Sequence, residues 1–197
     1  MLEISISGQK RTECGKKATK ELRKQGLVPC NIYGVKKGEN GLPEAESFVV
    51  PFTELRKVVY TPNVYVVNIN IDGAEKKAVI KELQFHPVTD ALLHIDFLEV
   101  VESKPVTVGI PVKLVGHAAG VRAGGRLALS IRTIKVTAPY TRIPEIIEVD
   151  VTPLELGKSI KVGQLNFEGL EFATPKEVVV CSVQMTRQAR AAANAAE

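Results

Sequence analysis

A histidine and an aspartate lie two positions apart in the stretch Leu92 to Val100, LLHIDFLEV. Alternate residues of a strand project to the same face, so His94 and Asp96 are expected roughly 6.5–7 Å apart at their Cα atoms. An imidazole beside a carboxylate could serve as the base of a hydrolase, with Asp96 orienting the ring. The same two side chains could instead offer directional hydrogen bonds to a docked partner.

The other members of an enzyme or metal site are missing from the sequence. There is no GxSxG turn, and the three cysteines, Cys14, Cys30 and Cys181, form no CxxC pair. The remaining histidines, His86 and His117, do not form the HxH or HExxH spacing of a zinc site. The Gly-rich stretch GVRAGGRL lacks the spacing of a P-loop and is expected to be a loop between strands, with its glycines at positive φ. We expect no catalytic residue, cofactor, metal or small-molecule substrate.

Positive charge is concentrated at the start of the chain. Residues 1–37 contain nine Lys or Arg against three acids, a net charge of +6. The whole chain carries +4, so the remainder carries −2. A basic N-terminal portion on a slightly acidic body indicates that one end contacts a polyanion.

The composition is that of an ordinary globular protein. The 197 residues are 45% hydrophobic and 24% charged, with no Trp. An odd cysteine count, no apolar leader and no membrane-length apolar run favour a soluble protein of the reducing cytoplasm that has no membrane partner.

The elements that must position His94 and Asp96 form a mixed first domain, residues 1–101. Strand-like alternation marks residues 2–11, 28–34 and 92–98, and a hairpin with the turn Asp72-Gly73 is expected over 64–83. Short helices are expected at 15–26 and 51–60, the second with Pro51 in its first turn. Parity in the last strand sends Leu93, Ile95 and Phe97 to the core.

The same parity brings one set of polar side chains to the outward face. Arg11 ends the first strand pointing outward, Tyr33 lies on the polar side of the second, and the first helix carries a basic stripe opposite Ala18 and Leu22. The stripe consists of Lys16, Thr19, Lys20 and Arg23. Basic side chains neutralise phosphates, while a phenol, an imidazole and a carboxylate can bond to 2′-hydroxyls and base edges of RNA. Asp96 could alternatively do no more than orient His94 or a basic neighbour.

The second half of the chain, residues 102–185, is expected to be an all-β domain, a sandwich or a barrel. Val106, Val108, Ile110, Val112 and Leu114 form one apolar face, and further short strands follow between Pro and Gly turns. The Ala-rich residues 186–197 are expected to be a flexible tail. The overall expectation is a mainly β protein with short helices.

Two distant motifs resemble one known family. RTECGKKATKELRKQGLVPCNIYG and HPVTDALLHIDF are similar to the bacterial large-subunit ribosomal protein twenty-five family, which binds 5S rRNA. KPVTVGIPVKLVGHAAGVRAGGRL and IPEIIEVDVTPLELGKSIKV resemble its long two-domain form, general stress protein Ctc. The resemblance covers nearly the whole chain.

This resemblance implies a first domain that is a small β-barrel docking on 5S rRNA, with neighbouring large-subunit components as further partners. Its RNA-binding positions correspond to Arg11, Lys16, Thr19, Lys20, Arg23, Tyr33, His94 and Asp96, with Gln84 as a weaker contact. Lys20 stands where some members carry Arg, which replaces a bidentate contact by a point charge. The implied role is a non-catalytic part of the ribosome. The alternatives are a stress-related interaction protein with incidental RNA binding, or a small hydrolase using His94 and Asp96.

Overall fold

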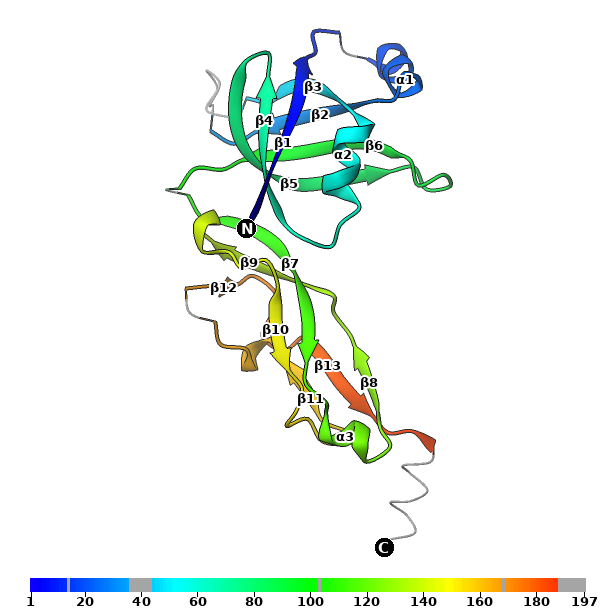
Figure 1. Cartoon of the computed structure of the whole chain (residues 1–197), viewed down its shortest axis with the longest axis vertical. Helices are drawn as coiled ribbons and strands as arrows, with labels where there is room; N and C mark the ends of the chain where they lie inside the picture. The colour runs from blue at the N-terminus through cyan, green and yellow to red at the C-terminus, as the bar shows by residue number, and fades with distance from the viewer. Residues whose placement is uncertain (14, 36–43, 103, 168, 188–197) are drawn as a thin grey trace, which may run out of the picture. The chain divides into compact units, whose positions relative to one another are not determined.

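The structure, a computed structural model, describes most of the chain. The described residues are 1–13, 15–35, 44–102, 104–167 and 169–187. Packing divides the chain into two compact units (Figure 1). The first consists of residues 1–106 with 139–141, and the second of residues 107–138 with 142–197. The predicted boundary after Val101 stays a prediction.

Six strands of the first unit close into a barrel in the order β1-β3-β2-β6-β5-β4 (Figure 1). The strands are β1 (Leu2–Lys10), β2 (Leu27–Tyr33), β3 (Glu46–Pro51), β4 (Tyr65–Ile71), β5 (Ala74–Phe85) and β6 (Leu92–Glu99). The pairs β1–β4 and β2–β6 are parallel, and the other four pairs are antiparallel. The predicted small barrel is confirmed.

Two helices accompany the barrel at the predicted places. Helix α1 (Lys16–Lys24) joins β1 to β2, and α2 (Phe52–Val59) follows β3. Pro51 was predicted in the first turn of α2, but it precedes that turn at the N-cap position, where its ψ of 134° is extended and no side chain makes a capping hydrogen bond. No residue of α1 is fully buried, whereas α2 contributes Leu55 and Val58 to the core. A helix as short as α1 is marginal alone and depends on the barrel for its position.

The barrel interior is filled by aliphatic side chains around two phenylalanines. Phe48 and Phe97 are fully buried, with their ring centroids 5.9 Å apart. Each fully buried side chain of this size contributes about 1.5–3 kcal/mol to folding. In the predicted hairpin, Asp72 and Gly73 both have positive φ (48° and 93°), as a two-residue turn of the primed type requires.

Strand β6 departs from the predicted alternation at its start. Phe85 of β5 pairs with Leu92 and Gln84 with His94, so the register shifts at Leu93. A bulge of this kind reverses the direction of the side chains before it. Leu92 is therefore buried and Leu93 only half-buried, the opposite of the expectation, while His94 and Asp96 keep their outward direction.

The second unit contains two sheets, ordered β10-β7-β9-β12 and β11-β13-β8. The elements after β6 are β7 (Val106–Val115), α3 (Ala119–Arg122), β8 (Arg126–Leu129), β9 (Thr133–Ala138), η1 (Tyr140–Arg142), β10 (Ile147–Asp150), β11 (Ser159–Lys161), η2 (Val162–Gln164), β12 (Glu171–Phe172) and β13 (Val179–Gln184). Of these, the first residue of β7 and residues 140–141 of η1 belong to the first unit. Leu114 of the first sheet and Cys181 and Val183 of the second share one apolar cluster. The predicted β-rich character is confirmed; residues 188–197 of the predicted tail lie outside the described residues.

The stretch GVRAGGRL is not the simple loop that was predicted, because its start forms the helical turn α3. Gly124 has a positive φ of 87°, as expected, but Gly120 and Gly125 do not. A Cβ on Gly120 would lie 2.6 Å from the main chain of Glu155, and one on Gly125 would lie 2.5 Å from Val183. Any larger residue at these two positions would clash, so the glycines allow the surrounding chain to pack closely.

Candidate nucleic-acid interface

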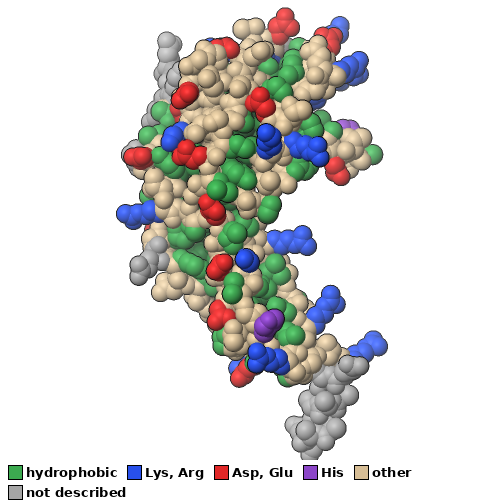
Figure 2. All heavy atoms as spheres, in the orientation of Figure 1, with side chains coloured by type: hydrophobic (Ala, Val, Ile, Leu, Met, Phe, Trp, Pro, Cys, Tyr) green, Lys and Arg blue, Asp and Glu red, His purple; other side chains and the backbone are tan. Residues whose placement is uncertain are grey.

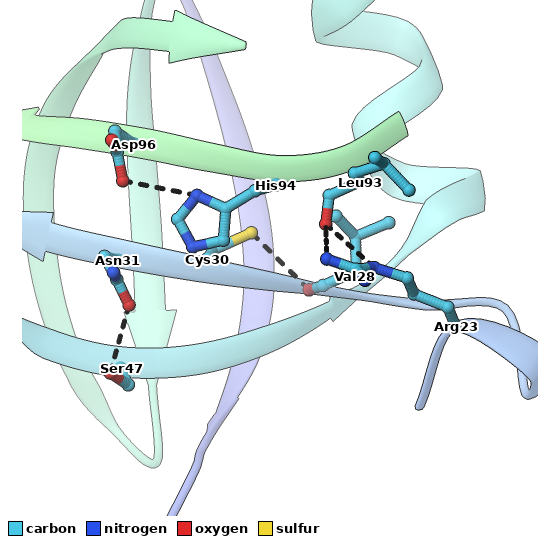
Figure 3. Close-up of polar contacts among 8 residues, drawn as sticks. All are labelled: Arg23, Val28, Cys30, Asn31, Ser47, Leu93, His94 and Asp96. Atoms are coloured by element: carbon cyan, nitrogen blue, oxygen red, sulfur yellow. Dashed lines mark hydrogen bonds and ion pairs between the residues drawn. The ribbon is translucent and has the colours of Figure 1, made fainter. Parts of the chain in front are cut away.

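His94 and Asp96 contact each other on the outward face of β6 (Figure 3). The Nδ1 atom of His94 lies 3.3 Å from the Oδ1 atom of Asp96, and the two side chains are 20% and 22% exposed. Because a carboxylate only accepts hydrogen bonds, Asp96 favours the tautomer of His94 that carries its proton on Nδ1. The second ring nitrogen, Nε2, is then an acceptor when the imidazole is neutral.

The surroundings of His94 favour that neutral form. Partial burial lowers the pKa of His94 below its ordinary value of 6.5. The carboxylate of Asp96 acts in the opposite direction, and the nearby charges of Arg23 and Arg11 lower the pKa further. At neutral pH the pair therefore presents two acceptors, Nε2 of His94 and the Asp96 carboxylate.

Tyr33 ends strand β2 beside this pair. Burial, followed by the carboxylates of Asp96 and Glu82, raises the pKa of the Tyr33 phenol. The hydroxyl therefore keeps its proton and can donate. Gly34, which follows, has φ 138°, and a Cβ there would lie 3.1 Å from the main-chain oxygen of Glu99. This crowding explains the glycine in the YG pair.

Arg11 lies just beyond β1 and lines two hollows. One, of about 270 Å³, is shared with Tyr33 and with Lys76, whose ammonium pairs with Glu46. The other, of about 340 Å³, separates the end of β1 from the apolar side of α1. The Nε atom of Arg11 donates to the main-chain oxygen of Glu13 at 2.6 Å. Arg11 therefore borders the same hollows as Tyr33 and the apolar side of α1.

Two members of the basic stripe on α1 are held by main-chain contacts. The guanidinium of Arg23 donates from Nε (3.1 Å) and Nη2 (2.9 Å) to the main-chain oxygen of Leu93 (Figure 3). The hydroxyl of Thr19 donates to the main-chain oxygen of Gly15 at 2.6 Å. Arg23 thus joins the helix to β6 immediately beside His94, and Thr19 ties down the start of the helix.

Lys16 and Lys20, the other two members of the stripe, are exposed on α1. They lie four residues apart, so they share one side of the helix. Figure 2 shows Lys and Arg side chains at the end of the first unit where α1 lies. Exposed ammonium groups such as these can neutralise phosphates without fixed geometry.

Gln84 is exposed on β5 and is the strand partner of His94. The structure therefore brings Gln84, His94, Asp96 and Arg23 together, with Tyr33 and Arg11 alongside. Lys16, Lys20 and Thr19 extend this face along the helix. All nine predicted residues belong to the first unit, and we call their common face the candidate surface.

Three polar residues of this face were not predicted as site residues. Asn31 of β2 is the register partner of Ser47 on β3 and of Asp96 on β6, and Asp96 is the partner of Glu82 on β5. The hydroxyl of Ser47 donates to Oδ1 of Asn31 at 3.0 Å (Figure 3). The alternation in VPCNIYG already predicts that Asn31 points outward. Its partners could not be predicted, because they depend on which strands pair.

The described residues do not complete an active site around His94. The hydroxyl of Ser47 on this face bonds to Asn31, and the thiol of Cys30 is buried in the core with its pKa raised by burial. Across the same described ranges, no three His, Cys, Asp or Glu side chains group so as to hold a metal ion. Nor is any described helix both long and apolar enough to cross a membrane.

Comparison with known proteins decides the family. Residues 6–97 match the Ribosomal L25p family, and residues 105–187 match the family described as ribosomal protein TL5, C-terminal domain. A relative from Phocaeicola vulgatus, named large ribosomal subunit protein bL25, is 58% identical over 98% of both chains. The chain belongs to the ribosomal L25p family.

Other relatives agree over the full length of the chain. The bL25 proteins of Bacteroides thetaiotaomicron and Porphyromonas gingivalis are 48% and 46% identical, over 100% and 98% of this chain and 99% and 98% of their own. The predicted resemblance is confirmed, including the two-part arrangement of the ribosomal L25p family followed by the TL5 C-terminal family. Membership in a family of ribosomal proteins also confirms the expectation that the chain is not an enzyme.

Proposed function

We propose that this chain is a structural constituent of the large ribosomal subunit that binds 5S rRNA through the candidate surface. The observation that carries the proposal is the contact between His94 and Asp96, which lies outward beside Arg23, with family membership as its context. A catalytic pair would need a nucleophile at this place, whereas the pair is surrounded by cations, an amide and a phenol.

The candidate surface makes two kinds of contact with the RNA. Lys16 and Lys20 neutralise phosphates and supply affinity that depends on salt. His94, Asp96 and Tyr33 offer acceptors and a donor at fixed positions on the barrel, which suits the 2′-hydroxyls and base edges of a wide RNA minor groove. Phosphate contacts position the protein, and the fixed groups recognise the RNA.

The setting follows from the relatives, which are named as large-subunit proteins. We place the chain in the cytoplasm as part of the ribosome. The second unit then has neighbouring ribosomal components available as partners.

Two measurements test the proposal. Sedimentation of a cell lysate should show the protein with the large subunit, and a filter-binding titration at fixed salt should show tighter binding to 5S rRNA than to an unrelated structured RNA of equal length. Equal affinity for both RNAs would overturn the 5S rRNA assignment. Migration free of ribosomes in growing cells would instead favour the stress-related interaction protein with incidental RNA binding.

A further inference from the structure

Asn31 lies in the middle of the candidate surface, on the strand between β3 and β6. Its register partners are Ser47 on one side and Asp96 on the other. The row continues from Asp96 to Glu82, so four neighbouring strands present one polar side chain each. Neighbouring strands are about 4.7–4.9 Å apart, which places Asn31 within reach of whatever Asp96 contacts.

The hydrogen bond from Ser47 determines which end of the Asn31 amide is available. The Ser47 hydroxyl donates to Oδ1 at 3.0 Å and thereby occupies the acceptor end of the amide. The other end, the NH₂ group on Nδ2, carries two donors. Since Asn31 is only half-buried, this group can meet a ligand on the outward face.

A donor and an acceptor on adjacent strands match the edge of a base in a minor groove. Every base pair there presents acceptors at purine N3 or pyrimidine O2, and guanine adds an amino donor. Asp96 can accept from an amino group while Asn31 donates to the acceptor beside it. Cations cannot make this distinction, because phosphate contacts carry no direct sequence information.

We propose that Asn31 is a specificity residue of the RNA surface, donating from Nδ2 to a purine N3 in the minor groove next to the amino group contacted by Asp96, and that Ser47 is its positioning residue. This inference rests on the proposed function and adds a base-reading contact to it. It also explains why an uncharged side chain lies among cations facing a polyanion.

The experiment measures the affinity of the full chain for a 5S rRNA fragment over a range of salt concentrations. Asn31→Leu, which has a similar shape and no donor, should bind roughly threefold to tenfold more weakly, the worth of about one hydrogen bond. Its salt slope should equal that of the wild type, because no phosphate contact is lost. Asn31→Asp, which keeps the oxygen that accepts from Ser47, should bind at least as weakly as Asn31→Leu. Asn166→Leu, at an exposed position of the second unit, is the matched control.

Two further measurements distinguish the loss of a base contact from a general effect on folding. Ser47→Ala should weaken RNA binding when it is made in the wild type. It should have no further effect in Asn31→Leu, because the hydrogen bond that positions the amide is already absent there. A 3-deazapurine at the contacted position, which lacks the N3 acceptor, should weaken the wild type and leave Asn31→Leu unchanged. A 2′-deoxy substitution there should affect both proteins equally.

The outcomes distinguish this inference from the proposed function. Wild-type affinity in both Asn31→Leu and Asn31→Asp, together with normal 5S rRNA binding by the wild type, would overturn the inference alone. Equal weakening of all variants by every 3-deazapurine would do the same. A wild-type chain that does not select 5S rRNA would overturn the proposed function and this inference with it.

Discussion

Arg23 donates two hydrogen bonds to the main-chain oxygen of Leu93, at 3.1 Å and 2.9 Å. The donor belongs to helix α1 and the acceptor to strand β6, which lie 70 residues apart in sequence. The contact compensates for the bulge at Leu93, because a carbonyl displaced from the regular ladder finds a charged donor. The basic helix and the His94–Asp96 pair are thereby held in one arrangement.

Replacing Arg23 by Lys should loosen that arrangement. Lysine keeps the charge but offers a point contact in place of the planar fork. We expect the free energy of unfolding to fall by about 0.5–1.5 kcal/mol and 5S rRNA binding to weaken in parallel. Urea unfolding checks the first effect, with Arg56→Lys on α2 as the exposed control. Equal unfolding free energies for the two variants would contradict this role of Arg23.

Lys16→Ala and Lys20→Ala should each weaken RNA binding through charge alone. The plot of log affinity against log salt should become shallower by about 0.7–0.9 for each lost phosphate contact. Lys158→Ala removes the same charge from an exposed side chain of the second unit and should leave the slope as it is. A salt slope that neither Lys16→Ala nor Lys20→Ala changes would show that these lysines of α1 do not contact phosphates.

His94→Ala and Asp96→Ala should each cost on the order of 1–3 kcal/mol of binding free energy, as directional base contacts do. The loss in the double variant should be smaller than the sum of the two single losses, because the two side chains contact each other. Titrations at one fixed salt concentration measure all three. Wild-type affinity in both single variants would show that the RNA docks elsewhere.

Acid should destabilise the first unit through His94. Burial lowers the pKa of His94 in the folded protein below its unfolded value near 6.5. The unfolded chain therefore takes up the proton first, so stability present above pH 6.5 is lost as the pH falls towards the folded pKa. Urea midpoints should drop more steeply in the wild type than in His94→Gln as the pH falls below about 6.5. Parallel curves for the two proteins would refute this assignment.

Gly8→Ala should destabilise the barrel from inside. A Cβ at this position would lie 2.7 Å from Cδ2 of Phe48, whose ring is fully buried against Phe97. Overpacking of this kind costs about 1–3 kcal/mol. Thermal unfolding measures it, with the exposed Ser5→Ala on the same strand as the control. A Tm equal to that of Ser5→Ala would mean that the Phe48 ring moves aside without cost.

Alternation and turn residues were sufficient to predict most of the barrel. Strands β1, β2 and β6, the Asp72–Gly73 hairpin and both helices lie where they were expected. Strand β3 was missed because Phe48, Val49 and Val50 form a continuous apolar run without alternation, and all three are buried. The two-residue strand β12 is too short for any periodicity to show.

The candidate surface was predictable only as far as each strand could be read alone. Parity places Tyr33, His94 and Asp96 outward without knowledge of their neighbours. The contact between Ser47 and Asn31 requires β2 to pair with the unpredicted β3. The burial of Leu92 in place of Leu93 follows from a register shift between two strands, which neither strand carries in its own residues.

The parallel pairing of β2 with β6 has a consequence for the order of events during synthesis. Strand β2 ends at Tyr33, but its partner begins only at Leu92, so the barrel depends on contacts between segments far apart in sequence. Such contacts form late and together, since the intervening chain must first be made and its ends brought near each other. A growing chain therefore exposes the positive charges of α1 well before it contains β6, the strand that carries the proposed RNA contacts His94 and Asp96.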